Sequence, residues 1–147
     1  MISTTTSTLS FTGNASTVTA YAITFPLVAA AHLVAIETVT ATGVETTLDP
    51  GDYTFTPTTD SDGRITGGSV TTDPAIAATS TIEFKRVTPK TQAFDLTAGG
   101  SFGAEAMESA WDKIVMIAQE VERDLLEADT VLAAATAALD VRVTALE

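Results

Sequence analysis

The chain has 147 residues and a formal net charge of −12 at pH 7. This length suits one small domain with an extension. The acidic balance argues against nucleic acid and against an anionic membrane surface as partners, because both attract cationic proteins. Since the sequence contains no cysteine, disulfide bonds and thiolate metal sites are excluded.

The N-terminal residues do not resemble a secretion signal, because residues 1–6 hold neither basic residues nor an apolar run. The longest apolar stretch, residues 27–36, is about ten residues long and too short to span a bilayer. We therefore expect a soluble chain that is made in the cytoplasm of its host.

The composition changes near Gly99 and Gly100. All five prolines and most of the threonines lie before this point, whereas residues 101–147 contain no proline. Threonine favours strands, and glycine and proline favour turns. The predicted organisation is a flexible Ser/Thr-rich arm over residues 1–20, a β-rich domain over 21–98, a glycine linker over 99–103 and a helix over 104–147.

Short segments of alternating apolar residues predict an antiparallel, sandwich-like β domain. The expected strands are residues 21–25, 33–40, 44–48, 53–56 and 81–87. Turns are expected at residues 49–52, at 60–63 and at Gly67-Gly68. Residues 3–10 have little to bury, so we expect a neighbouring molecule to order them.

The C-terminal segment carries an apolar seam whose steps alternate four and three residues, the period of a coiled coil. The seam consists of Met107, Trp111, Ile114, Ala118, Val121, Leu125, Ala128, Leu132, Ala135 and Leu139, and after a four-residue slip it continues at Val143 and Leu146. It predicts a long helix that self-associates, and by itself it permits a dimer or a trimer. The alternative is an amphipathic helix that folds back over its own sheet, most plausibly along residues 104–118.

No catalytic, metal or cofactor site is predicted. Residues 99–103 match the G-x-S-x-G string of α/β-hydrolases, but the single histidine, His32, precedes the serine and no βαβ pattern surrounds it. We interpret His32 as a partly buried strand residue or a polar group at an interface. Asp60 and Asp62 begin like a calcium loop but lack its remaining ligands, so a turn is the better interpretation.

The one basic cluster in this acidic chain consists of Lys85, Arg86 and Lys90. It is a candidate docking site for an acidic partner surface. A solvated strand edge is the alternative, because charged residues on an edge discourage unwanted strand pairing.

Several segments, taken in order, resemble the N-terminal domain of tail fibre and tailspike proteins of short-tailed phages. They are Tyr21-Ala22-Ile23-Thr24-Phe25-Pro26, residues 48–55, Ile82-Glu83-Phe84-Lys85-Arg86-Val87-Thr88-Pro89, residues 94–102, residues 105–113 and Ala118-Gln119-Glu120-Val121. The resemblance covers about residues 21 to 126 and rests on the order of these motifs. The corresponding patterns of the family include a strand of the type I-x-R-x-T and a helix of the type D-x-x-x-x-x-x-Q-E.

The resemblance implies a virion protein: a parallel homotrimer without catalytic activity that fixes a fibre to the phage tail. The α+β fold would then be a β head on a trimeric coiled-coil stalk. The implied partners are sister copies, tail hub, nozzle or adaptor proteins, and a distal receptor-binding protein. Gly103 stands where many family members have an N-capping threonine, a tolerable departure.

Relatives usually continue into a shaft and a tip, whereas this sequence ends within the predicted coiled coil, so we expect an adaptor or a short fibre. The alternative class is a trimeric bacterial surface adhesin or a carbohydrate-binding module. Such proteins are also threonine-rich, β-rich and acidic, but a secretion signal or an exposed aromatic platform would be expected of them.

Overall fold

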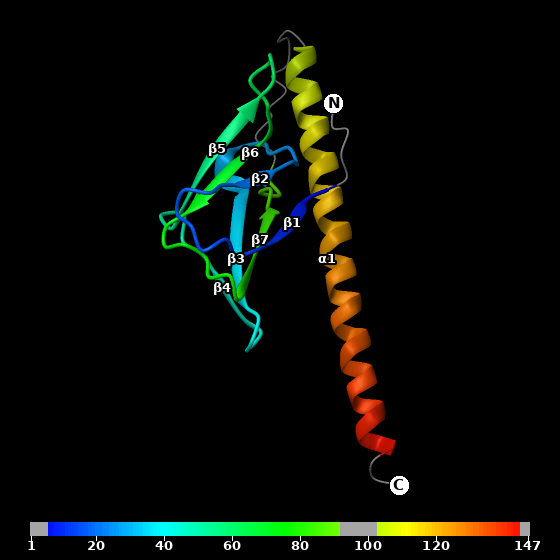
Figure 1. Cartoon of the computed structure of the whole chain (residues 1–147). Coiled ribbons are helices and arrows are strands. Elements are labelled where there is room, and N and C mark those ends of the chain that lie inside the picture. Colours follow the sequence, from blue (N-terminus) through cyan, green and yellow to red (C-terminus); the bar gives the residue numbers. More distant parts are fainter. Residues whose placement is uncertain (1–5, 92–102, 145–147) are drawn as a thin grey trace.

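The computed structural model describes residues 6–91 and 103–144, and these form a β head and one long helix (Figure 1). The head contains two antiparallel sheets. One sheet has the order β1 (Thr8–Thr12), β7 (Ser80–Arg86), β3 (Leu33–Val39) and β4 (Val44–Thr47), and the other has the order β2 (Tyr21–Ile23), β6 (Ile65–Thr72) and β5 (Tyr53–Thr59). The predicted combination of antiparallel sheets and a C-terminal helix is confirmed.

The two sheets share one apolar core. The ring of Tyr21, on the smaller sheet, lies 5.5 Å from the rings of both Phe11 and Phe84, which belong to the larger sheet. Residues from both sheets and from the segments that connect their strands complete the buried cluster: Ile23, Phe25, Leu27, Leu33, Ala35, Val70, Ile76 and Ile82. The alternation of apolar side chains therefore places one face of most strands in this core, whereas every residue of the edge strand β4 is exposed.

The turn at residues 60–63 has the predicted character. The Asp60 carboxylate accepts hydrogen bonds from the backbone N–H groups of Asp62, at 3.0 Å, and Arg64, at 2.9 Å. Gly63 has a φ of +76°, which glycine adopts without strain. The acidic side chain thus closes the β5–β6 hairpin, as the interpretation of this segment as a turn requires.

The expected turn at Gly67-Gly68 is wrong, because both residues lie inside β6, which the sequence patterning missed. This strand is the centre of the smaller sheet, between β2 and β5. A Cβ atom at Gly67 would overlap the Ile23 carbonyl, and one at Gly68 would overlap the Thr56 carbonyl and the Phe55 ring. These glycines allow neighbouring backbones to approach closely rather than forming a turn.

The prediction of a flexible arm over residues 1–20 is also wrong for its described part. β1 pairs with β7 along its length, from Thr8 opposite Lys85 to Thr12 opposite Thr81. The side chain of Phe11 packs against the core. The arm is ordered within its own chain because β7 offers it an unpaired edge, and the ladder bonds do not depend on the polar side chains.

The helix α1 (Ala104–Thr144) begins directly after Gly103, whose carbonyl accepts a hydrogen bond from the Met107 N–H. Its 41 residues span about 60 Å. The first half lies beside β1 and β7, and the second half extends past the head (Figure 1). The predicted linker residues 99–102 lie outside the described residues.

Candidate functional site

Arg86 lies in the interior of the molecule. Alternate residues of β7 point inward, so Ile82, Phe84 and Arg86 share one face, and all three are fully buried. A buried guanidinium is unstable unless a counter-charge and hydrogen-bond acceptors surround it. The position of Arg86 therefore requires partners from another element, and α1 supplies most of them.

The Arg86 guanidinium donates hydrogen bonds to groups on the helix and on the head. Its Nε lies 2.8 Å from Oε1 of Glu120, and one terminal nitrogen lies 2.8 Å from Oε1 of Gln119 and 3.3 Å from the Met116 carbonyl. The other terminal nitrogen bonds the Pro26 carbonyl at 2.9 Å. Burial lowers the pKa of Arg86, and the hydrogen bond with Glu120 opposes this shift.

The Glu120 carboxylate, only 3% exposed, also holds the chain that follows β7. It accepts hydrogen bonds from the N–H of Thr88, at 2.8 Å, and from the Thr88 hydroxyl, at 2.6 Å. We call Arg86, Thr88, Gln119 and Glu120 the head–helix clamp. Arg86, Thr88 and Glu120 are buried and Gln119 is half-buried. Because these residues are bonded to one another, the clamp fixes the helix at one position against the head.

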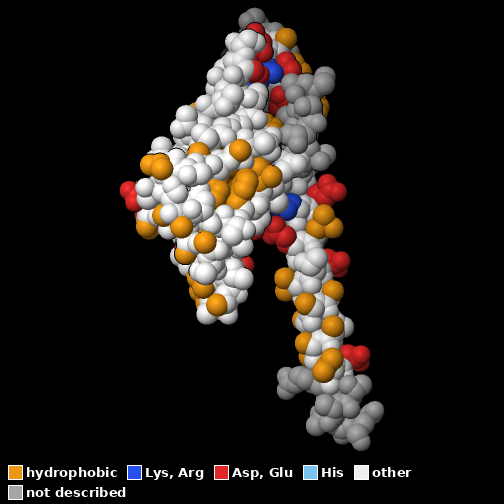
Figure 2. Space-filling model, in the orientation of Figure 1, with side chains coloured by type: hydrophobic (Ala, Val, Ile, Leu, Met, Phe, Trp, Pro, Cys, Tyr) orange, Lys and Arg blue, Asp and Glu red, His pale blue; other side chains and the backbone are white. Residues whose placement is uncertain are grey.

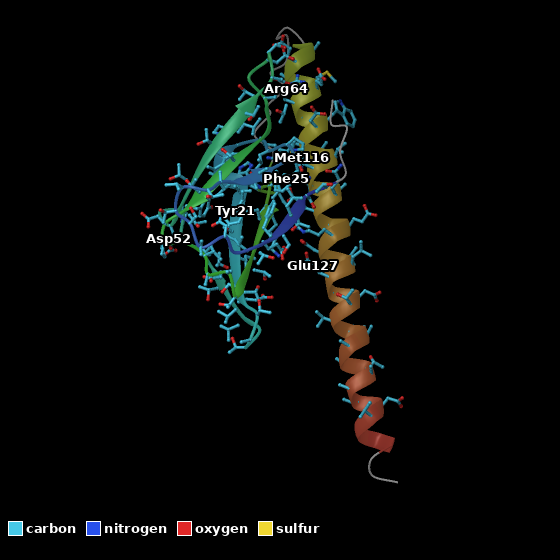
Figure 3. The ribbon with its side chains drawn as sticks, in the orientation of Figure 1. Tyr21, Phe25, Asp52, Arg64, Met116 and Glu127 are labelled. Carbon is cyan, nitrogen blue, oxygen red and sulfur yellow. The ribbon has the colours of Figure 1, made fainter. Side chains whose placement is uncertain are left out.

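Additional polar contacts join the two parts on either side of the clamp. Nearer the start of the helix, Arg64 pairs with Glu108 at 3.2 Å and thereby lowers the pKa of the Glu108 carboxyl. Farther along, a terminal nitrogen of Arg123 donates to the Arg86 carbonyl at 3.0 Å. Glu127 lies 3.7 Å from the Lys85 ammonium group. Figure 3 shows Arg64 near the beginning of α1, and Met116 and Glu127 on the side of the helix toward the head.

His32 lies close to this interface. It ends a short 3-10 turn directly before β3, and its Nδ1 atom is buried without a hydrogen-bond partner among the described residues. Burial lowers the pKa of His32, and the nearby Lys113 ammonium group lowers it further, while Glu120 acts in the opposite direction. Its position agrees with the interpretation of His32 as a polar group at an interface.

The opposite face of α1 is apolar and exposed. The large residues of the predicted seam, from Trp111 to Leu139, are 40% to 66% exposed. We call this set the apolar stripe: Trp111, Ile114, Ala118, Val121, Leu125, Ala128, Leu132, Ala135 and Leu139. Figure 2 shows hydrophobic side chains along the part of the helix that extends past the head. Every described side chain from residue 124 to residue 141 is exposed.

Helix geometry separates the stripe from the head. Met116 and Glu120, one turn apart, are the buried residues of the described helix. Ala118 lies two residues from each of them and thus about 200° around the helix axis. The two faces are therefore nearly opposite, and packing on the head leaves the stripe uncovered. The helix therefore lies against its own head where it carries the clamp, but Trp111, Ile114 and Val115, which a helix folded over its own sheet would bury, are exposed.

The candidate docking cluster is wrong for Arg86, because the guanidinium is buried within its own chain. Lys85 pairs with Glu83 and Glu127, whereas Lys90 is exposed. Among the predicted seam residues, Met107 is half-buried, and the Val143 side chain and Leu146 lie outside the described part.

No family model matches the chain, and neither does any curated protein. Within the described ranges no three histidine or acidic side chains form a group that could hold a metal ion. Across the same ranges, the structure contains no helix with the length and apolar character that crossing a membrane requires.

Proposed function

We propose that the chain is a structural, non-catalytic part of a phage tail fibre or fibre adaptor. It assembles as a parallel homotrimer through α1 and anchors a fibre to the phage tail. The observation that carries the proposal is the exposed apolar stripe on the face of α1 opposite the head. Sister helices can cover this face without displacing the head, so the heads surround a central bundle of helices.

The energetics favour covering the stripe. Each large side chain contributes about 1.5–3 kcal/mol when it is fully buried. Six of the stripe residues are large and 40% to 66% exposed, so burying what remains exposed in three chains works against the cost of the two association steps that form a trimer, roughly 4–15 kcal/mol each. Apart from the ion pair between Glu127 and Lys85, the described side chains from residue 124 to residue 141 are exposed to solvent, and an isolated helix of that length is marginal in water.

The width of the apolar face supports three helices rather than two. Val115 and Val131 flank the stripe and are also exposed, at 43% and 70%. A two-stranded coiled coil needs only a narrow seam, whereas a broader face is typical of bundles with more helices. The resemblance to phage tail fibre proteins favours a trimer as well.

The clamp connects this resemblance to the geometry. Arg86 and Thr88 match the R-x-T of the family's I-x-R-x-T pattern, in which Phe84 stands in place of the isoleucine, and Gln119 and Glu120 form the Q-E pair of the helix. Segments that resemble the family at two distant places in the sequence are thus the ones that join head and stalk. On this proposal each head is held rigidly beside the stalk, where it meets tail hub, nozzle or adaptor proteins, and the distal stalk leads toward a receptor-binding protein.

Light scattering tests the assembly. The purified chain is expected at three times its mass of 15.2 kDa. The double variant Leu125→Asp and Leu132→Asp is expected to be monomeric while it keeps the β signal in circular dichroism, because its charges lie in the stripe and not in the head. Thr130→Asp, on the exposed face away from the stripe, is the matched control and should remain trimeric. If the parent chain is monomeric at micromolar concentration, the proposed trimer is contradicted.

The place of the protein in a virion needs its own test. Purified phage particles from the source strain are expected to contain the chain, detectable by mass spectrometry, and its gene should lie among genes for tail or portal proteins. Absence of the chain from purified particles would contradict the anchoring function even if the trimer forms.

A further inference from the structure

A shallow hollow lies on the apolar stripe just past the clamp. It is lined by Ala118, Val121, Glu122, Leu125, Leu126 and Asp129. The first three and Leu125 stand at positions i, i+3, i+4 and i+7 of the helix, which is the arrangement that accepts a side chain of a partner helix in a coiled coil. The small Ala118 side chain leaves this space open. The hollow thus has the form expected where a second copy of α1 docks.

The heptad spacing identifies what enters the hollow. In the notation abcdefg, the stripe places Ala118 and Leu125 at a and Val121 at d, so Glu122 is an e residue. A hole built from two a residues, one d and one e receives the d residue of the same layer when the helices are parallel and in register. The occupant would be Val121 of the neighbouring chain.

The same register brings two acidic residues together. In parallel coiled coils a g residue faces the e residue five positions later on the next helix. Asp124 is at g and Asp129 at e, so each Asp124 would face Asp129 of a neighbouring chain. Both are exposed. Asp124 also accepts hydrogen bonds from the Arg123 guanidinium of its own chain, at 2.7 and 3.0 Å, whereas Asp129 lies on the rim of the hollow.

The remaining described flanking positions do not compensate for this contact. The g positions are Ala110, Ile117, Val131 and Ala138, and the e positions are Glu108, Val115, Glu122 and Thr136. None is basic, so no attractive ion pair between chains offsets the acidic one at the e and g positions of the described helix.

We infer that the Asp124–Asp129 contact between neighbouring chains restrains assembly of the stalk and makes it dependent on ionic strength. The inference rests on the proposed self-association of α1 and specifies its orientation and register. Like charges at facing positions oppose association and salt screens them, so added salt strengthens the trimer. A Lys at position 129 would convert each repulsive contact into an attractive one.

Sedimentation equilibrium of the full chain tests the inference at about 10 mM and about 0.5 M NaCl, between which charge screening changes strongly. Asp129→Lys is expected to raise the association constant of the trimer about tenfold to a hundredfold at low salt, since three exposed pairs change sign. Its association should weaken as salt is added, opposite to the parent. Glu45→Lys, on the exposed edge strand β4, makes the same change in net charge and should respond to salt as the parent does.

The outcomes separate this inference from the proposed function. If the parent chain assembles but the association constant of Asp129→Lys depends on salt as that of Glu45→Lys does, the two aspartates do not meet. The inference then fails, while the proposed trimeric stalk is retained. Weaker association of Asp129→Lys at low salt leads to the same conclusion. If the parent is monomeric at both salt concentrations, the proposed assembly fails, and the inference fails with it.

Discussion

Replacing Glu120 with leucine removes the helix half of the head–helix clamp. The carboxylate accepts hydrogen bonds from Arg86 and from two groups of Thr88, and both it and Arg86 are buried. Removing one partner of a buried ion pair lowers the free energy of unfolding by about 3–5 kcal/mol, because the other charge stays in the interior without its counter-charge. Arg86 keeps three other acceptors, so we expect a loss near the lower end, about 3 kcal/mol.

Glu127→Leu is the matched control on the same helix. The Glu127 side chain is 50% exposed, and its ion pairs with Lys85 and Arg123 are both 3.7 Å long. Exposed pairs of this kind contribute at most about 1 kcal/mol. The free energies of unfolding are measured by urea titration with circular dichroism, at one chain concentration for all variants.

A double variant keeps the test informative if Glu120→Leu does not fold. Arg86→Met combined with Glu120→Leu removes both charges and is expected to regain part of the lost stability, since apolar replacement of a whole buried pair is often tolerated. The reasoning is refuted if Glu120→Leu is as stable as Glu127→Leu, because the carboxylate would then not be desolvated against Arg86 in solution.

Two other predictions concern the head. Burial lowers the pKa of His32 in the folded chain below 6.5, so the unfolded chain binds the proton more readily. The contribution of neutral His32 to the free energy of unfolding is therefore fully present above about pH 6.5. It is lost as the pH falls through that value toward the pKa of the folded state. Urea unfolding between about pH 8 and pH 5 should therefore show a steeper loss for the parent than for His32→Asn, and equal slopes would contradict the assignment. Gly68→Ala is expected to cost about 1–3 kcal/mol, because its Cβ would meet the Phe55 ring and the Thr56 carbonyl. Gly51→Ala, with open space around it, should change the free energy of unfolding by less than about 0.5 kcal/mol. If Gly68→Ala changes it as little as Gly51→Ala does, β6 is not closely packed at this position.

The arrangement of clamp and stripe has a consequence for how the chain assembles. The clamp positions one face of α1 on the head, and the contacts from Arg64 and Lys85 extend this attachment along the helix. The opposite face is held in place before any partner arrives. On the proposed function, a rigid monomer of this kind would associate with little further ordering of its first half, which lowers the entropic cost of assembly.

The sequence alone determined the division into a β head and a helix, because proline, glycine and threonine favour turns and strands wherever they occur. It also determined the helix start after Gly103 and the apolar stripe, since both follow from local composition and spacing. The turn at Asp60 belongs to the same class, because the carboxylate bonds backbone groups only two and four residues away.

Only the tertiary structure decided that β1 joins the larger sheet and that Gly67 and Gly68 lie in a central strand. Both depend on backbones that are far apart in the sequence and meet in the fold, and glycine has no side chain whose pattern could reveal this. The clamp is a similar case. The docking interpretation overlooked that Arg86 continues the alternation of Ile82 and Phe84, and its partner Glu120 is 34 residues away, so only the packing of α1 on the head brings the two charges together.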